Sequence, residues 1–220
     1  MDGVLVRGTH LFKLWKFFYS EGYVTKGDTR IIFSLVNRYL RGKIPYRAFA
    51  DEGIVFAASC IRGMDKEGIE KSAAKFIRTV KVPYFSYAKE LINLFKKNGY
   101  KTIIISGSNM ELLNGYNKTL KADKIYGSIF EIKKGRYTGA VEINMSLEES
   151  KRRVLEKMAN IDFPASFAFG DSDQDLAILE RVGNPVALNP TKLLKKIAQE
   201  RGWTVLTKKD DVVDVVRSLM

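Results

Sequence analysis

The chain has 220 residues, enough for one large domain or for a medium domain that carries an insertion. Hydrophobic residues make up 45% and charged residues 28% of it, which excludes a chain that is disordered throughout. No stretch approaches the ~20 uninterrupted apolar residues that a membrane-spanning helix needs. The only cysteine, Cys60, cannot form an internal disulfide, so we expect a reducing compartment and a cytoplasmic location.

The chain is strongly basic, with 37 lysines and arginines against 25 acidic residues and a net charge of +12. Such an excess is found in proteins that bind nucleic acid, an anionic lipid surface or an anionic substrate. The basic residues occur in ones and twos, and no aromatic residues are interleaved with them in a basic block. We therefore favour an anionic small substrate and keep an anionic surface or a nucleic acid as the weaker alternative.

Residues 10–80 show the apolar spacing of helices throughout. In the segment 10–19, Leu11, Leu14 and Phe18 recur at helical intervals with lysines between them. Because the lysines interrupt the apolar run and no small-residue cleavage site follows, we interpret this segment as a core-facing helix rather than a signal peptide. A helix that lies on a membrane surface is the alternative. Further helices are predicted over 28–40, 47–61 and 66–80.

Strand and helix patterns alternate from residue 84 to the end of the chain. The runs 100–106 and 165–169 are short and apolar, as is typical of buried parallel strands. Other strands are predicted within 125–141, around a Lys-Gly turn, and over 185–188 and 204–206. Helices are predicted over 84–97, 110–120, 147–159, 174–182, 191–199 and 211–219. This alternation predicts an α/β fold with a parallel sheet covered by helices on both faces.

The two patterns divide the chain into domains. We expect residues 1–9 and 81–220 to form an α/β core domain, and residues 10–80 to form an all-α domain inserted into it. Ligands of such sheets bind outside the carboxyl ends of the strands. The polar residues at those ends, Asp2, Ser106 and Asp171, are therefore the first candidates for a functional site.

Three carboxylates follow the predicted strand 165–169, at Asp171, Asp173 and Asp175. Clustered carboxylates repel one another and suit a hard cation such as Mg²⁺, which takes carboxylates, waters and phosphate oxygens as ligands. An EF-hand loop is excluded because its sixth-position Gly and twelfth-position Glu are missing. Capping of the next helix by these aspartates is the structural alternative to a metal site.

Three weaker signals occur elsewhere. Ser106-Gly107 follows a predicted strand and precedes a helix, an arrangement that offers a hydroxyl and backbone N–H groups to an anion. Lys151 stands near the start of a predicted helix, where the helix dipole disfavours a cation, although an ordinary surface lysine is the alternative. Asp2-Gly3 leads into the apolar residues that follow it.

The order of these signals resembles the haloacid dehalogenase superfamily of phosphohydrolases. The motifs follow one another in the same order as in that family. They are Asp-Gly-Val-Leu from Asp2, a helical insertion, a strand that ends in Ser106-Gly, a single Lys151, and Gly-Asp171-Ser-x-x-Asp175. The chain is most similar to its phosphoserine-phosphatase-like branch, and the stretch 135–139 adds to this resemblance. The resemblance covers essentially the whole chain. It implies a Rossmann-like core with a parallel sheet and an all-α cap of the C1 type.

The resemblance also implies roles for individual residues. In this family one aspartate attacks the phosphorus to form an aspartyl-phosphate, and a second, two residues later, acts as general acid and base. Asp2 matches the second aspartate. Ser106 and Gly107 would bind the phosphate, and Lys151 would be catalytic by keeping the nucleophile ionised and by binding the phosphate.

Mg²⁺ is the implied cofactor, and Asp2, Asp171 and Asp175 would hold it, the last directly or through its waters. The implied function is a Mg²⁺-dependent phosphomonoester phosphatase that acts on a small phosphorylated metabolite, as a monomer or homodimer. A non-catalytic relative that binds phosphate or Mg²⁺ is the alternative.

One feature departs from the family pattern Asp-x-Asp-Gly, which normally follows a buried strand. Here Met1 occupies the x position, so the nucleophile would lie one residue before it and the first strand is absent as well. Three explanations are open: the natural chain starts upstream, the protein is inactive, or Asp2 acts as nucleophile in a shifted register. We favour the first explanation. We expect the 220-residue chain to hydrolyse phosphomonoesters poorly or not at all.

The substrate is less well defined. A phosphoserine enzyme of this branch would carry a Glu soon after the first motif and an Arg in the cap. The position after the first motif holds Arg7, Thr9 and His10 instead of a Glu. The region where the cap Arg is expected holds Asp51 and Glu52 but no Arg. This pattern disfavours phosphoserine. Thr9 and His10 are candidate substrate contacts, and the aromatic residues of 10–80 leave room for an apolar leaving group.

Overall fold

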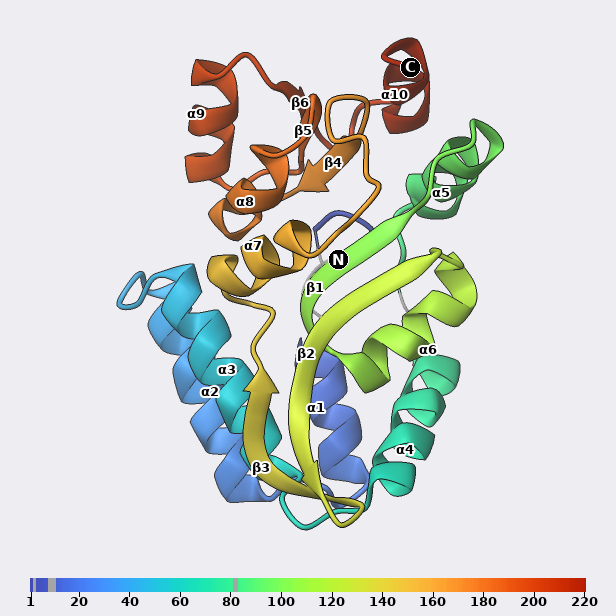
Figure 1. Ribbon diagram of the computed structural model, residues 1–220. Coiled ribbons are helices and arrows are strands. Elements are labelled where there is room, and N and C mark those ends of the chain that lie inside the picture. The colour runs from blue at the N-terminus through green and yellow to red at the C-terminus, as the bar shows by residue number, and fades with distance from the viewer. Residues whose placement is uncertain (2, 8–10, 81–82) are drawn as a thin grey trace.

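The computed structural model describes residues 1, 3–7, 11–80 and 83–220. Asp2, Thr9 and His10 lie outside the described residues. Four helices follow one another in the first part: α1 (Leu11–Ser20), α2 (Lys26–Leu40), α3 (Tyr46–Cys60) and α4 (Lys66–Thr79). They lie together with the hairpin β2–β3 at one end of the molecule, the lower end in Figure 1. The helices expected in this part of the chain are confirmed.

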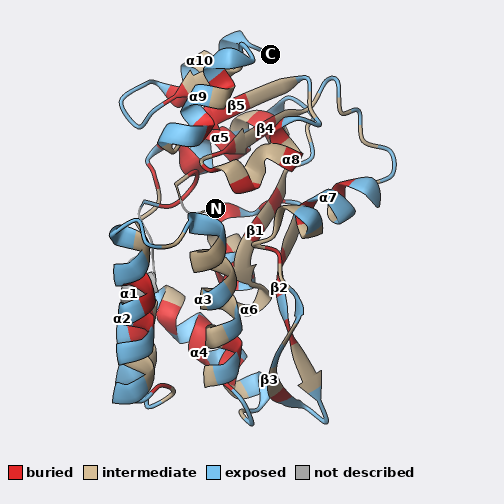
Figure 2. Ribbon diagram, turned by 90° about the vertical axis from the view of Figure 1, so that its left-hand side faces the viewer, coloured by how far each residue is buried: buried red, intermediate tan, exposed pale blue. Residues whose placement is uncertain are grey.

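The interior of the helical part is apolar and aromatic. Trp15 stacks on Phe56 with ring centroids 5.6 Å apart, and Ile32 and Leu35 of α2 pack into the same cluster. The opposite face of α2 is exposed (Figure 2). This one-sided burial is what the apolar spacing of an amphipathic helix predicts.

The second part of the chain alternates helices and strands, as expected. It contains α5 (Tyr87–Lys97), β1 (Ile103–Asn109), α6 (Met110–Leu120), β2 (Lys124–Lys133), β3 (Arg136–Ile143), α7 (Glu148–Glu156), β4 (Phe167–Gly170), the 3₁₀ turn η1 (Asp173–Asp175), α8 (Leu176–Leu179), β5 (Asn184–Leu188), α9 (Lys192–Glu200), β6 (Thr204–Leu206) and α10 (Val212–Ser218). The α/β fold class with parallel strands is confirmed.

The strands form two sheets of three strands each, in the orders β1-β2-β3 and β4-β5-β6. The pairs β1–β2, β4–β5 and β5–β6 are parallel, and β2–β3 is an antiparallel hairpin. A cavity of about 230 Å³ lies between the sheets, lined by residues 103–105 of β1 and 167–169 of β4. Within the described residues no strand joins β1 to β4, so the single parallel sheet expected from the sequence is divided in two.

The hairpin β2–β3 connects the two parts of the molecule. Lys134 (φ 51°) and Gly135 (φ 75°) form its turn, and two successive positive φ angles match the twist of a hairpin. Tyr137 is 1% exposed and packs with Ala58 and Ile69 of the cap helices. The Tyr137 backbone N–H also donates to the carbonyl of Met64 at 2.9 Å. The stretch 135–139, noted from the sequence, therefore anchors the hairpin to the helical part.

Candidate functional site

The buried ion pair between Lys151 and Asp175 is the centre of the candidate site. Lys151 lies in α7 and is only 5% exposed; its Nζ donates to Asp175 Oδ1 at 2.6 Å. Burial raises the pKa of the Asp175 carboxyl, but the Lys151 ammonium and the hydrogen bonds from Lys151 and the Asp171 backbone together hold that pKa below its ordinary value. The alternative of an ordinary surface lysine at position 151 is wrong.

The chain folds tightly after β4 and brings Asp171 and Asp175 together. The backbone N–H of Asp171 donates to Asp175 Oδ2 at 3.1 Å. Gly170 permits this approach, because a Cβ on it would lie 2.6 Å from the Cβ of Asp175. Neither η1 nor α8 is capped by a side-chain hydrogen bond, so helix capping does not account for these aspartates.

The amino-terminal segment reaches the same turn. Gly3 has φ +71°, and a Cβ on it would lie 2.0 Å from Oδ2 of Asp171. Glycine is required here for its conformation and for the close contact. Two long-range hydrogen bonds hold the segment: Asn189 Nδ2 donates to the Gly3 carbonyl at 2.9 Å, and Tyr87 Oη donates to the Val4 carbonyl at 2.9 Å. The residue next to Asp2 is thereby fixed beside Asp171.

Ser106 and Gly107 lie at an irregularity of β1. The strand continues to Asn109 rather than ending at Ser106, but its pairing with β2 shifts register between Ile105 and Asn109. Ser106 is 6% exposed, and its Oγ accepts a hydrogen bond from the Ser108 backbone at 3.2 Å. The expected strand end is thus an interruption within a longer strand.

Three polar residues that the sequence did not indicate hold this part of β1. Ser128 is fully buried; its Oγ donates to the Gly107 carbonyl at 2.7 Å and accepts from the Met145 backbone at 3.0 Å. Asn144 Oδ1 accepts from the Ser146 backbone at 3.0 Å, and Ser146 packs directly against Gly107. The segment that leads into α7 is therefore attached to β1 beside the candidate phosphate-binding residues.

A fourth missed residue, Asn189, could have been found from the sequence. It follows directly after β5 and has φ +50°. Its Nδ2 contacts the Gly3 carbonyl, and its Oδ1 accepts from the Lys208 backbone at 2.5 Å. The strand-end rule that selected Ser106 and Asp171 applies to this position as well.

The described residues fit a magnesium site in part. Asp171 and Asp175 supply hard carboxylate oxygens, and the buried Gln174 Oε1 in the same turn has no hydrogen-bond partner, so it could accept from a metal-bound water. Both oxygens of Asp175 already accept hydrogen bonds from the protein. No group of three or more potential ligands occurs within the described residues, and Asp2 is not among them.

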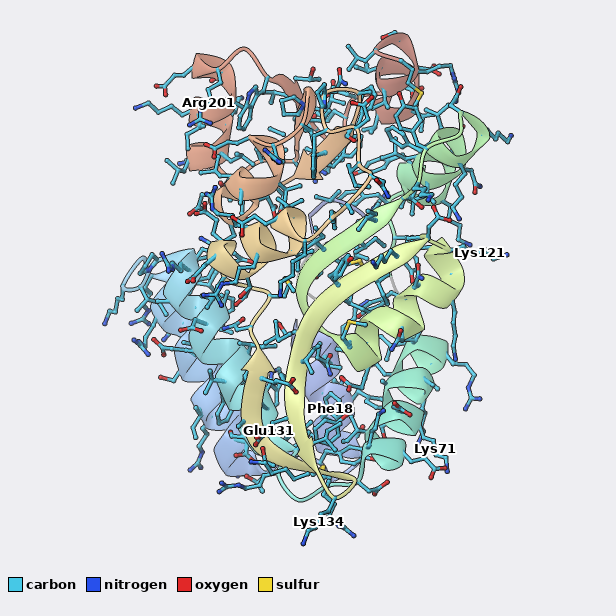
Figure 3. The ribbon with its side chains drawn as sticks, viewed as in Figure 1. Phe18, Lys71, Lys121, Glu131, Lys134 and Arg201 are labelled. Atoms are coloured by element: carbon cyan, nitrogen blue, oxygen red, sulfur yellow. The ribbon has the colours of Figure 1, made fainter. Side chains whose placement is uncertain are left out.

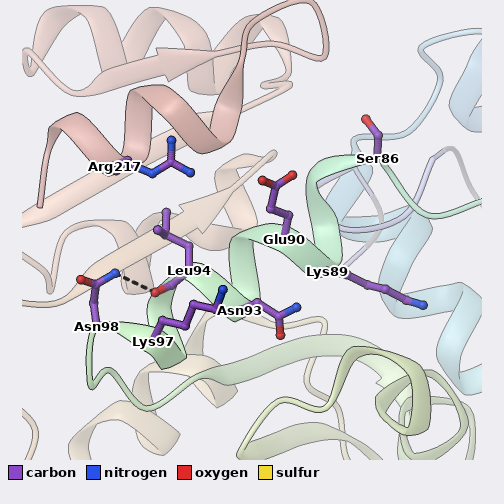
Figure 4. A pocket seen from close by; sticks show the side chains of 8 residues that line it. All are labelled: Ser86, Lys89, Glu90, Asn93, Leu94, Lys97, Asn98 and Arg217. Carbon is purple, nitrogen blue, oxygen red and sulfur yellow. Dashed lines mark hydrogen bonds between the residues drawn. The ribbon is translucent and has the colours of Figure 1, made fainter.

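Another concave surface lies away from the candidate residues. It has a volume of about 550 Å³ and is formed by α5 and by Arg217 of α10 (Figure 4). Lys89, Glu90, Asn93 and Lys97 of α5 line it together with the flanking residues Ser86 and Asn98, and none of the candidate residues lines it. We assign it no part in the site.

None of the described helices has the length and apolar character of a membrane span.

Comparison with known proteins agrees with this arrangement. A family model described as haloacid dehalogenase-like hydrolase matches residues 1–180. The phosphoserine phosphatase of Archaeoglobus fulgidus is 27% identical over 170 residues, which cover 76% of this chain and 46% of that protein. The histidinol-phosphatase of Neisseria meningitidis is 28% identical over 167 residues, which cover 72% of this chain and 75% of that protein. The chain spans about half the length of the first curated relatives that it matches.

Solved structures show the same fold. A protein of unknown function from Bordetella pertussis superposes with a TM-score of 0.79 at 23% identity, covering 94% of this chain and 96% of that one. A substrate-bound phosphoserine phosphatase superposes with a TM-score of 0.68 at 20% identity, covering 99% and 94%. At these identities the likeness concerns the fold alone. The family model, which spans most of the chain, shows that this protein belongs to the haloacid dehalogenase-like hydrolases.

Proposed function

We propose that this chain belongs to a Mg²⁺-dependent phosphomonoester phosphatase that acts through an aspartyl-phosphate on a small phosphorylated metabolite. The observation that carries the proposal is the buried ion pair between Lys151 of α7 and Asp175. Asp175 lies in the same turn as Asp171, which contacts Gly3. A buried lysine held by a carboxylate is a strong electrostatic stabiliser for an anionic substrate. Relatives named as phosphoserine and histidinol phosphatases support the substrate class.

The residues divide the chemistry among them. The Ser106 hydroxyl and the Gly107 N–H donate to phosphoryl oxygens, and Lys151 neutralises the charge that builds up between the phosphate and an attacking carboxylate. Asp2 donates a proton to the leaving oxygen and then takes one from the attacking water. Asp171 and Asp2 would hold Mg²⁺, while Asp175 orients Lys151. The metal would screen the phosphate charge so that an anionic nucleophile can approach.

The nucleophile would be an aspartate two positions before Asp2, which lies outside the 220 residues. The test therefore compares this chain with one extended upstream by its genomic reading frame. We expect the extended chain to hydrolyse para-nitrophenyl phosphate with Mg²⁺ and to lose this activity in EDTA, and the shorter chain to be nearly inactive. The codon before Met1 should specify aspartate.

Variants of the extended chain test the assigned residues. Lys151→Met and Asp171→Asn should lower kcat/KM at least ~100-fold, as the removal of one electrostatic stabiliser does in other enzymes. Asp173→Asn is the matched control, because this carboxylate lies in the same turn and has no assigned role, and it should leave activity unchanged. Binding of Mg²⁺ and phosphate without turnover by the extended chain would instead indicate a non-catalytic relative.

A further inference from the structure

A chain of polar contacts links the cap helix α3 to the candidate phosphate site. Asn144 Nδ2 donates to Asp51 Oδ1 at 2.6 Å. Asn144 Oδ1 accepts from the Ser146 backbone at 3.0 Å, and a Cβ on Gly107 would lie only 3.0 Å from the Ser146 Cβ. Asp51 is therefore separated from Gly107 by only two intervening residues. It lies on the side of the site that faces the cap.

The Asp51 carboxylate has no cationic partner among the described side chains. It is half-buried, and within the described residues it forms no ion pair, whereas the next residue, Glu52, pairs with Arg38 at 2.9 Å. Only Oδ1 of Asp51 has a hydrogen-bond donor in the described part of the chain. A carboxylate on this side repels the phosphate of a substrate, and a positive charge on another part of the substrate would offset that repulsion.

We propose that Asp51 is a specificity-determining residue that selects phosphomonoesters whose leaving group carries a cation such as an alkylammonium. This inference rests on the proposed function, because it requires the phosphate to lie at Ser106 and Gly107. With the phosphate there, an ammonium on the leaving group would pair with Oδ2 of Asp51, while the hydrogen bond from Asn144 to Oδ1 holds the carboxylate in place. Such a charge-assisted contact at a half-buried group corresponds to about a tenfold gain in affinity.

A purely structural role for Asp51 makes a different prediction. If the Asp51–Asn144 hydrogen bond only attaches the cap to the core, then its loss weakens the binding of every phosphate ligand by the same factor. The ratio of the affinities for a cationic ligand and for a neutral ligand of the same shape does not change when both affinities fall by the same factor. This ratio is therefore the quantity to measure.

The experiment measures binding of 2-aminoethylphosphonate and of propylphosphonate, which has a methyl group in place of the ammonium, by calorimetry in the presence of Mg²⁺. We expect the unmodified chain to bind the amino compound about tenfold more tightly. Asp51→Asn keeps an acceptor for Asn144 and should abolish the preference while leaving the affinity for propylphosphonate nearly unchanged. Glu52→Gln, on the same helix, should keep the preference.

Three results would overturn the proposal. Equal affinities in the unmodified chain, or an equal loss for both ligands in Asp51→Asn, would leave Asp51 with a structural role only. If the extended chain still hydrolyses para-nitrophenyl phosphate after either of these two results, then the proposed function stands and only the role of Asp51 is rejected. If neither phosphonate binds, the phosphate site and this proposal fall together.

Discussion

At the scale of single residues, the buried Lys151–Asp175 ion pair affects stability as well as chemistry. The side chains are 6% and 14% exposed, so both charges have lost most of their water. The attraction between them, and the hydrogen bond from the Asp171 backbone, offset that loss. Either charge left alone in this place would be strongly unfavourable.

Lys151→Met should therefore lower the free energy of unfolding by about 3 kcal/mol, because it leaves the Asp175 carboxylate without its cation. Urea denaturation followed by circular dichroism measures the change. The double variant Lys151→Met/Asp175→Leu should recover much of the loss, since no unpaired charge remains. The control Lys157→Met removes an exposed lysine at the end of the same helix and should have little effect. A midpoint unchanged in Lys151→Met would contradict the description of a buried pair.

The sequence pointed to residues whose types can carry chemistry, and it did not indicate the residues that hold them in place. Lys151, Asp171 and Asp175 follow a recognisable order along the chain. The partners of Ser128 and Asn189 depend on contacts over long sequence separations: Asn189 contacts Gly3, 186 positions away. A serine within a strand has no periodic pattern, so only the folded structure reveals the role of Ser128. The position of Asn189 directly after β5 makes it a candidate by the strand-end rule, but its distant partner is visible only in the folded structure.

At the scale of elements, apolar periodicity predicted most helices and strands, and local hydrogen bonds decided their ends. The helix expected over 174–182 is instead a 3₁₀ turn followed by the short α8, because the chain bends to bring Asp175 back to the Asp171 backbone. The helix expected from residue 28 starts at Lys26. Thr25 caps it, in a reciprocal pair of hydrogen bonds with Asp28.

This capping box gives a prediction for α2. Thr25→Ala removes the side-chain acceptor of the Asp28 N–H, which bonds at 3.1 Å, and should destabilise the protein by about 1 kcal/mol. Thermal denaturation measures it. Ser34→Ala is the control, because Ser34 is exposed within the same helix and alanine is the better helix former there. Equal effects of the two substitutions would show that the cap contributes nothing.

At the scale of the whole molecule, the net charge of +12 is distributed rather than concentrated. Lys71, Lys121 and Lys134 project from separate parts of the surface (Figure 3). Several other basic side chains are engaged in ion pairs with acidic neighbours, such as Arg38 with Glu52. A scattered positive charge repels itself and attracts anions over a distance.

General screening and specific anion binding can be separated by the choice of salt. At equal ionic strength, chloride and phosphate screen the positive charge alike, whereas only phosphate should occupy the site at Ser106 and Gly107. At a concentration ~10 times its Kd, bound phosphate stabilises a protein by about 1.4 kcal/mol, which for a chain of this size raises Tm by about 3–5 °C beyond the effect of chloride. Ser106→Ala should reduce this excess, whereas Ser218→Ala, at the end of α10, should not. Equal Tm values in the two salts would mean that the basic character of the chain attracts anions without binding phosphate at this site.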